Sequence, residues 1–523
     1  MNDITLVCLG DIKNEISLMF PMGVLYLASY LENCGFKVEC KDIRIIPYIN
    51  QQQFFNAVLK HLKTSANVIG FSCTTEVLPF AIQIAKSIKI NTPHKIIILG
   101  GQGLAEVEEE VLKAFPFIDI IVVGEGELTL ADIMHHIKER KNLDDVKGIV
   151  YRNKDNIFCN PARERIKDLD SLPMPAYSKI NIEDYGNFSI VTERGCPYHC
   201  TFCSEGAFWG HSIVHRSING VLDEISMLKN KYNINNFTVN DAVFTTSAKR
   251  VYEFCSGLKE RRLDIKWACH GRIGLIDEGM MKNMANSGCE HIGFGVESGS
   301  NKVLKEIQKI FTIEQAETTI NKACTIFRNV QLYYMWGFPS EELKDFIDTL
   351  CSVYRLMNKN KNINILFSRL VPYFNTRLYK ENISNIKRIK NRRACILPFS
   401  SYSLPKWVFD YPTIFPHYLY LKTGSTGEKK EMLNCCWRET YDLVEKALLD
   451  LKKNGAISDM PNKSLQNKGF AKNEPPSYLA KEFFRAILHK LENQKDLFGS
   501  LKSTHDLINK IIRTKSFYKV FSI

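Results

Sequence analysis

Short apolar runs alternate with amphipathic stretches over the first 130 or so residues of the chain. The apolar runs are typical of buried β-strands, whereas the stretches between them repeat apolar residues every three or four positions, as helices do. The predicted strands are Ile4–Leu9, Val38–Arg44, Val68–Cys73, Lys95–Leu99 and Ile118–Val123. Because helices separate these strands, the pattern predicts an α/β unit built on a doubly wound parallel sheet.

A second series of strands and helices runs from Ile190 to about residue 375. Its predicted strands are Ile190–Thr192, Phe237–Asn240, Ile265–Ala268, His291–Val296, Gln331–Met335 and Ile363–Phe367. Six strands that alternate with helices predict a partial (β/α)6 barrel. The active site of such a barrel lies at the carboxyl ends of its strands.

A predicted hairpin and the Pro-rich stretch Asp168–Pro175 separate the two series. Beyond about residue 380 the pattern loosens and predicts a mainly helical C-terminal region. Its aromatic stretch Tyr402–Tyr420 belongs more readily to a packed core than to a cover over a substrate. Cys435 and Cys436, farther on, fit two buried thiols better than a substrate-side role. The expected domains are 1–145, 146–185 for the hairpin and linker, 186–380 for the barrel, and 381–523.

Small or polar residues follow three strands of the first series. In an open parallel sheet, ligands bind beyond the carboxyl ends of the strands, so these residues predict a ligand-binding edge. The residues concerned are Ser72, Thr74, Gly100, Gly101, Gly124, Glu125 and Gly126.

Composition narrows the class of protein only modestly. Of 523 residues, 45% are hydrophobic and 24% charged, which is ordinary for a globular protein. The net charge of +12 is spread over a long chain, so a nucleic-acid partner is disfavoured. There is no long apolar run and no signal-peptide pattern at the start, so we expect a cytoplasmic protein without a membrane span.

Three cysteines lie within eight residues, directly after the first predicted barrel strand. Cys196, Cys200 and Cys203 are spaced CxxxCxxC. Iron–sulfur clusters are held by cysteine thiolates, usually four, so three would leave one iron open. A structural zinc site requires four ligands, and no second cysteine pair lies nearby in the sequence. Zinc in an interaction protein and three unrelated buried thiols remain as alternatives.

This loop, with Phe202 just before its last cysteine, resembles the radical S-adenosylmethionine (SAM) superfamily. The resemblance implies a [4Fe–4S] cluster on the three cysteines and cleavage of SAM to a 5′-deoxyadenosyl radical. Four later segments also resemble the family in order: 236–244, 266–272, 293–299 and 337–341. The implied SAM contacts are Phe202, Asp241, Arg272, Glu297, Ser298 and Gly337.

The first unit, placed before such a barrel, resembles the cobalamin-binding branch of that superfamily. The resemblance implies cobalamin as a further cofactor, in contact with the strand-end residues named above. One departure is clear: the Asp-x-His-x-x-Gly segment of cobalamin mutases is missing, and the segment 10–13 offers no histidine in its place. The resemblance therefore suggests no histidine ligand to cobalt.

Function follows from the resemblance and stays open in detail. The leading expectation is a methyltransferase that acts on an unactivated carbon through the 5′-deoxyadenosyl radical and methylcobalamin. The alternatives are a cobalamin-dependent cyclase or rearrangement enzyme, a methylthiotransferase-like enzyme, and the zinc-binding interaction protein. We expect a small-molecule or peptide substrate and a reducing partner such as flavodoxin or ferredoxin. The sequence identifies neither the substrate nor the oligomeric state.

Overall fold

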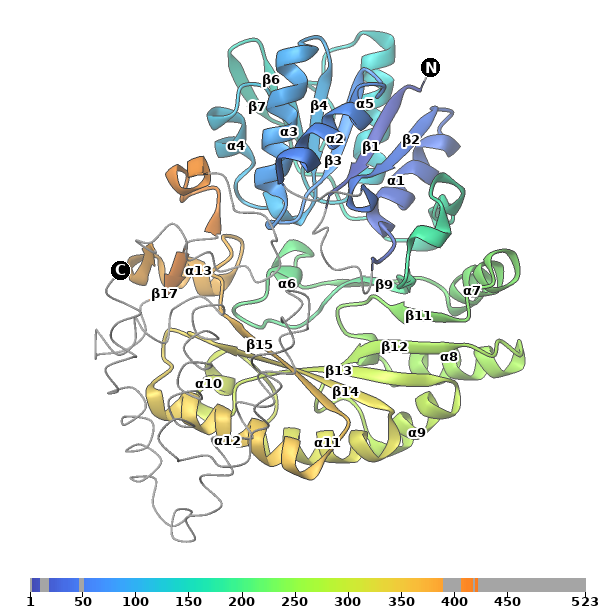
Figure 1. The fold of residues 1–523 in the computed structure, drawn as a ribbon, viewed down its shortest axis with the longest axis vertical. Helices are drawn as coiled ribbons and strands as arrows, with labels where there is room; N and C mark the ends of the chain where they lie inside the picture. Colours follow the sequence, from blue (N-terminus) through green and yellow to red (C-terminus); the bar gives the residue numbers. More distant parts are fainter. Residues whose placement is uncertain (1, 10–17, 47–50, 389–405, 417–418, 422–523) are drawn as a thin grey trace.

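Two α/β units lie one above the other in the computed structural model, with the segment 160–215 between them (Figure 1). The structure describes residues 2–9, 18–46, 51–388, 406–416 and 419–421. Each unit is built on its own sheet, as the two series of strands predicted.

The N-terminal unit contains a seven-stranded sheet in the order β2-β1-β3-β4-β5-β6-β7. The first five of these strands are mutually parallel and confirm the predicted doubly wound sheet. Its strands are β1 (Ile4–Cys8), β2 (Val38–Asp42), β3 (Val68–Ser72), β4 (Ile96–Gly100), β5 (Ile120–Val122), β6 (Ile149–Asn153) and β7 (Asn156–Cys159). Its helices are α1 (Met22–Asn33), α2 (Gln51–Leu62), α3 (Leu78–Asn91), α4 (Glu108–Ala114) and α5 (Gly126–Glu139).

Two features of this unit go beyond the sequence prediction. The hairpin β6–β7, expected in the segment 146–185, pairs antiparallel with β5 and extends the sheet. Helix α5 begins directly at Gly126, where the glycines had indicated only a strand end. The apolar side chains of α5 pack in the same cluster as those of α1, so the two helices cover the same face of the sheet.

The barrel unit is an all-parallel sheet in the order β15-β14-β13-β12-β11-β8, which confirms the six predicted strands. Its strands are β8 (Ser189–Ile190), β11 (Asn236–Val239), β12 (Lys266–Gly271), β13 (Cys289–Glu297), β14 (Asn329–Trp336) and β15 (Ile363–Arg369). The helices on its outer face are α7 (Ile218–Tyr232), α8 (Ala248–Glu260), α9 (Glu278–Asn286), α10 (Asn301–Glu306), α11 (Ile313–Ile326) and α12 (Leu343–Lys359).

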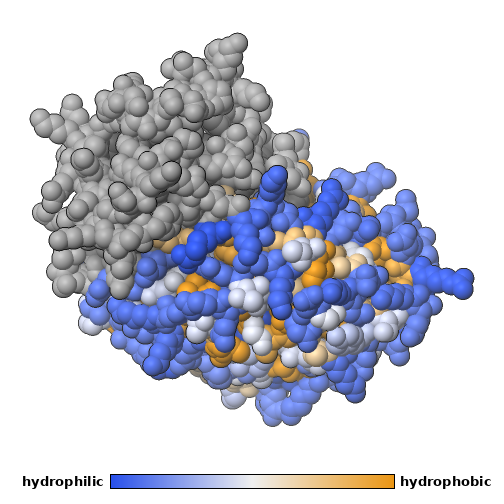
Figure 2. All heavy atoms as spheres, turned by 90° about the horizontal axis from the view of Figure 1, so that it is seen from below, coloured by the Kyte–Doolittle hydropathy of each residue, from blue (hydrophilic) through white to orange (hydrophobic). Residues whose placement is uncertain are grey.

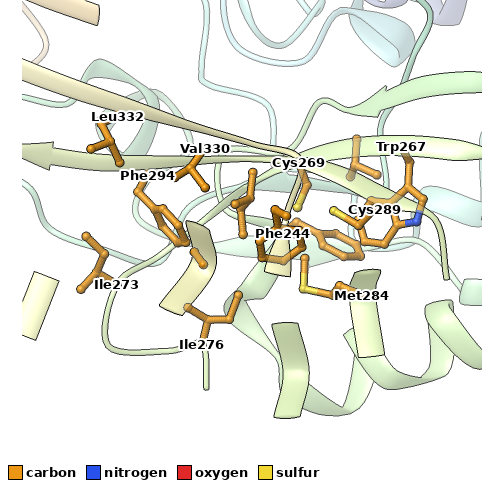
Figure 3. Packing of buried hydrophobic residues seen from close by; sticks show 14 of the residues in the cluster. Phe244, Trp267, Cys269, Ile273, Ile276, Met284, Cys289, Phe294, Val330 and Leu332 are labelled. Atoms are coloured by element: carbon orange, nitrogen blue, oxygen red, sulfur yellow. The ribbon is translucent and has the colours of Figure 1, made fainter. Parts of the chain in front are cut away.

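The core of the barrel unit lies between its sheet and these helices. Trp267 and Cys289 from adjacent strands pack with Phe244 and with Met284 of α9 (Figure 3). Trp267 is 1% exposed and donates its indole N–H to the Ser287 carbonyl at 3.0 Å. Burial of this apolar layer fixes which face of each strand points outward and leaves the other face toward the barrel interior.

A short hairpin and one short helix lie where the two units meet. Strand β9 (Glu193–Gly195) pairs antiparallel with β10 (Ile213–His215), and α6 (Ser204–Phe208) lies between them in the chain. Figure 1 shows β9 and α6 between the two sheets. The predicted cysteine loop connects β9 to α6.

The described C-terminal segment 406–416 packs against the N-terminal unit. Trp407 and Tyr411 contact the ring of Phe115, with ring centroids 5.5 and 5.1 Å apart, and Phe415 is 1% exposed in the same cluster. Phe415 is therefore core, whereas Trp407 and Tyr411 are partly buried and pack against that core. Cys435, Cys436 and the C-terminal helices expected beyond residue 440 lie outside the described residues.

Within the described residues, no helix is both long and apolar enough to span a membrane. The face of the molecule seen from below mixes apolar side chains with polar ones (Figure 2). A few large apolar side chains, such as Ile310 and Ile383, are more than half exposed.

A buried network of hydrogen bonds connects α7 of the barrel unit with the linker and with α1 of the N-terminal unit. Glu224 of α7 is 0% exposed and accepts hydrogen bonds from the Tyr177 hydroxyl of the linker and from Arg216. Arg216 also donates to the Tyr26 hydroxyl of α1 at 3.1 Å. Since burial removes water from all four groups, each depends on the others for its hydrogen bonds.

We expect Glu224→Gln to destabilise the protein by about 3–5 kcal/mol, because it leaves the buried Arg216 guanidinium without its counter-charge. Asp223→Asn at the neighbouring position is the control, since Asp223 makes an exposed ion pair with Arg261 whose loss costs less than about 1 kcal/mol. Urea denaturation followed by circular dichroism measures both. Equal effects of the two substitutions would contradict the role given to Glu224.

Candidate functional site

A cavity of about 360 Å³ lies between the carboxyl edge of the N-terminal sheet and the start of the barrel unit. The ends of β3, β4 and β5 form its upper wall. The lower wall comes from the barrel unit and includes Val191, Glu193, Arg194, Glu205, Trp209 and Asn240. The upper wall contains every strand-end residue that the sequence predicted: Ser72, Thr74, Gly100, Gly101, Gly124, Glu125 and Gly126.

The glycines of the upper wall serve two different purposes. Gly124 has φ +79°, and a Cβ built there would meet nothing within 4 Å, so its missing side chain leaves open space at the cavity. Gly101 has φ +114°, and its Cβ would lie 2.5 Å from the Cys73 carbonyl oxygen. Gly101 therefore allows the turn after β4 to pack on the end of β3. The open position at Gly124 fits a ligand that approaches the main chain.

Glu125 lines the cavity, but its carboxylate is already paired. It accepts the Ile166 backbone N–H at 2.8 Å and forms an ion pair with Arg194 at 2.9 Å. Glu127 pairs with the same guanidinium at 2.6 Å. These carboxylates therefore join the two units, a role that local sequence pattern could not reveal.

The cysteine loop begins at a strained turn. Gly195 has φ +102°, and a Cβ there would lie 2.1 Å from the Ser212 carbonyl oxygen of the paired strand. Only glycine fits at this position, and its close packing fixes the backbone conformation directly before Cys196. At the other end, the Cys203 N–H bonds to the Cys200 carbonyl at 3.1 Å, and α6 starts at the next residue.

The three thiols lie near one another. Burial raises the pKa of Cys203 to about 11, and the neighbouring Cys200 adds to the raised pKa values of both Cys203 and Cys196. In the described part of the chain, no three His, Cys, Asp or Glu side chains are grouped closely enough to hold one metal ion. A four-iron cluster places each thiolate on a different iron and so holds thiols that are near one another without meeting at one point.

Arg272 is the predicted residue that comes closest to the loop. Its guanidinium lies 3.7 Å from the centre of the Tyr198 ring, and one nitrogen is 3.7 Å from the Cys200 sulfur. Arg272 is 6% exposed, yet its Nε and one Nη have no hydrogen-bond partner. Buried guanidinium N–H groups are normally satisfied, so this pair of donors fits a carboxylate supplied by a ligand.

The other predicted contacts divide into two groups. Phe202 makes an edge-to-face contact with Phe338 at 5.7 Å, and its ring lies beneath the ammonium group of Lys309. Lys309 also pairs with Glu297 at 3.1 Å, where Glu297 has φ +72° at the end of β13. Phe202 and Glu297 are thus joined through Lys309, which the sequence gave no reason to select.

The polar groups of Asp241, Ser298 and Gly337 form hydrogen bonds within the protein. Asp241 accepts the Thr192 backbone N–H at 2.8 Å. The Ser298 hydroxyl, 0% exposed, lies 3.2 Å from that of Thr349. The Gly337 N–H donates to Glu341 at 2.5 Å. These groups shape strand ends and loops around the barrel mouth.

Glu193 is a buried carboxyl group that sequence analysis missed. It is 4% exposed on the cavity wall, and one carboxylate oxygen has no hydrogen-bond partner. The other oxygen lies 3.0 Å from the His215 ring. Burial raises the pKa of Glu193 to about 8, and burial together with Glu193 raises the pKa of Asp241 to about 7. Glu193 carries no motif of its own.

A second cavity of about 350 Å³ opens beside Cys200 and Cys203. The rings of His199 and His211 are stacked along it with centroids 4.2 Å apart. His211 Nδ1 lies 2.8 Å from the Tyr198 carbonyl oxygen, which ties the middle of the cysteine loop to the hairpin.

Comparison with known families identifies both units. Residues 17–134 match the B12 binding domain, and residues 190–351 match the radical SAM superfamily. The first match covers most of the N-terminal sheet and the upper wall of the cavity. The second contains the cysteine loop, Arg272 and Glu297.

The chain is also similar to curated relatives and to solved structures. The chain is 28% identical over 371 residues to an uncharacterized methyltransferase of Pyrococcus horikoshii, covering 70% of this chain and 79% of that one. It is 29% identical over 321 residues to an anaerobic magnesium-protoporphyrin IX monomethyl ester cyclase of Rubrivivax gelatinosus, covering 57% and 56%. The structure of the cobalamin-dependent radical enzyme OxsB superposes with a TM-score of 0.67 at 19% identity, covering 93% of this chain and 71% of that one.

Because the folded protein retains a proton on Glu193 that the unfolded chain releases, the free energy of unfolding should fall as the pH rises from about 4.5 to about 8. Glu193→Gln should reduce this dependence, since the amide has no proton to lose, while Asp241, whose pKa burial also raises, keeps its own contribution. Anaerobic urea denaturation at several pH values measures the slope. Glu164→Gln, at a glutamate whose side chain is 85% exposed, should leave the slope unchanged. An unaltered slope in Glu193→Gln would refute the assignment.

Proposed function

Because the chain belongs to the radical SAM enzymes that carry a B12-binding domain, we propose that it is a methyltransferase acting on an unactivated carbon. The observation that carries this proposal is the cavity between the two units. The strand-end residues predicted to bind cobalamin line one wall of this cavity, and Arg194 and Gly195, directly before the cysteine loop, line the opposite wall. A methyl carrier and a radical generator must act on the same substrate, so they must share one space.

The two domains imply cobalamin, SAM and a [4Fe–4S] cluster as cofactors. We propose that Cys196, Cys200 and Cys203 hold the cluster and leave one iron open for SAM. The cluster would pass one electron from a reductant to SAM, giving methionine and a 5′-deoxyadenosyl radical that would remove a hydrogen atom from the substrate carbon. Cobalamin, when bound, would supply this carbon with a methyl group taken from a second SAM, which leaves S-adenosylhomocysteine.

We propose that the chain's own residues orient SAM beside the loop. Arg272 has two buried N–H groups without partners, which would receive the SAM carboxylate. Phe202 and the Lys309–Glu297 pair form the adjoining wall. Asp241, Ser298 and Gly337, whose polar groups bond within the protein, would hold the surrounding strand ends in place. Each acts by position and needs no change in charge during the reaction.

We propose that the upper wall of the cavity binds cobalamin. Ser72 and Thr74 line this wall, and Gly124, whose Cβ position is open, would let the ligand approach the backbone. Gly100, Gly101 and Gly126 lie on the same wall, where their missing side chains let neighbouring protein atoms pack closely. Glu125 shapes the wall while its carboxylate stays paired with Arg194. The B12-binding match covers every one of these positions.

A cyclase is the second candidate, because one relative carries that name over 57% of this chain. Both candidates need the same cofactors and the same cavity. They differ in whether SAM also serves as methyl donor. We further propose a cytoplasmic enzyme, a small-molecule or peptide substrate, and a flavodoxin- or ferredoxin-like reducing partner.

The products of SAM separate the two candidates without knowledge of the substrate. The anaerobically reconstituted enzyme is incubated with hydroxocobalamin, SAM and a strong reductant, and the products are measured by mass spectrometry. A methyltransferase forms S-adenosylhomocysteine in a cobalamin-dependent manner and also forms 5′-deoxyadenosine. Formation of 5′-deoxyadenosine alone would exclude methyl transfer from SAM. Cys200→Ala should lose 5′-deoxyadenosine and most bound iron, whereas Cys159→Ala, at an exposed cysteine, should keep both.

We expect Arg272→Lys to weaken SAM binding roughly 10- to 100-fold, because a lysine cannot donate two parallel N–H groups to a carboxylate. Equilibrium dialysis against the cluster-loaded protein measures the dissociation constant, and iron content shows whether the cluster is intact. Arg261→Lys, at a partly exposed arginine of the same unit, is the matched control. Unchanged SAM affinity with a full cluster would refute the contact.

A further inference from the structure

Arg194 connects the cavity's upper wall to the cysteine loop. One nitrogen of its guanidinium lies 2.9 Å from Glu125 and another 2.6 Å from Glu127, at the start of α5. The three side chains are 12%, 6% and 5% exposed, and the guanidinium lies 5.1 Å from the centre of the Tyr26 ring of α1. Three groups of the N-terminal unit thus hold one side chain of the barrel unit.

Only Gly195 separates Arg194 from the first cysteine of the loop. Gly195 is confined by its close approach to Ser212. A displacement of Arg194 must therefore also displace Cys196. Arg165 strengthens the joint by donating to the Arg194 carbonyl at 3.0 Å and to the Ser212 carbonyl at 3.1 Å. The start of the loop is therefore held at backbone and side chain alike.

The other end of the loop is tied to the same cavity. Glu205 lies two residues after Cys203 and accepts a hydrogen bond from Gln102, at the end of β4, at 2.5 Å. It also accepts the Trp209 indole N–H at 2.6 Å. Gln102, Glu205 and Trp209 all line the cavity. Contacts with the upper wall therefore bracket the loop from both sides.

We propose that Arg194 is a positioning residue that couples occupancy of the cavity to the position of the cysteine loop. The inference rests on the proposed placement of cobalamin in this cavity. A ligand that orders the upper wall orders Glu125 and Glu127, and through Arg194 the entry to the loop. Coupling of this kind is reciprocal, so a cluster that fixes the loop must tighten cobalamin binding by the same factor.

The test compares hydroxocobalamin affinity before and after assembly of the cluster in the same full-length protein. Equilibrium dialysis under anaerobic conditions gives a dissociation constant for each state, and the ratio of the two is the measure of coupling. A purely structural role for Arg194 would change both constants and leave their ratio intact. We expect a ratio of about ten or more for the unmodified protein, within the usual range for coupled sites.

Arg194→Lys is the test variant, because it keeps the buried positive charge while losing the two-pronged contact. Arg163→Lys is the matched control. Arg163 forms an ion pair with Asp132 and donates a hydrogen bond to Thr129 at 2.8 Å. Both partners belong to α5, as Glu127 does, but neither they nor Arg163 line the cavity. Glu127→Gln provides a second test from the other side of the contact, should Arg194→Lys fold poorly.

The coupling is supported if the ratio falls below about three in Arg194→Lys or Glu127→Gln and stays at about ten or more in Arg163→Lys. It is overturned if the unmodified protein binds hydroxocobalamin equally well in both states, if the test variants keep the full ratio, or if the control loses it too. A protein that binds hydroxocobalamin in neither state contradicts the cobalamin site itself and, with it, the coupling.

Discussion

The structure depends on two sheets whose parallel strands end at one shared cavity. A parallel sheet needs helices on its faces, which leaves its carboxyl edge as the place where loops and ligands gather. Here the edge of β3, β4 and β5 faces β9 and α6, the two elements that the cysteine loop connects. Residues of both units line this cavity, so its shape depends on how the two units are held against each other.

Buried polar groups around this cavity are of two kinds: some have hydrogen-bond partners within the protein, and others have polar atoms without a partner. Asp241 and Ser298 bond within the protein and are fully buried in that role. Arg272 and Glu193 are just as buried but keep polar atoms without partners. Native proteins seldom leave buried polar atoms unsatisfied, so these atoms are candidates for contact with a ligand.

Much of this arrangement could be predicted from sequence, because it follows from local pattern. Apolar periodicity placed the strands of both sheets, and the cysteine spacing located the loop. Helix α5 was missed because its glycine-rich start resembles a turn. Glu193 and the pairing of Arg194 with Glu125 could not be found, since contacts between residues 69 positions apart leave no periodic signal. The family resemblance supplied the cofactors but not which polar groups are already engaged.

Hydrogen–deuterium exchange with and without hydroxocobalamin tests whether the cavity between the two units binds cobalamin. We expect hydroxocobalamin to slow exchange on both walls at once, in peptides covering residues 72–74, 100–103 and 124–127 and in those covering 191–195. The outward helices α8 and α11 serve as internal references that should not change. Protection confined to those helices, or to one wall alone, would show that hydroxocobalamin does not bind between the two units.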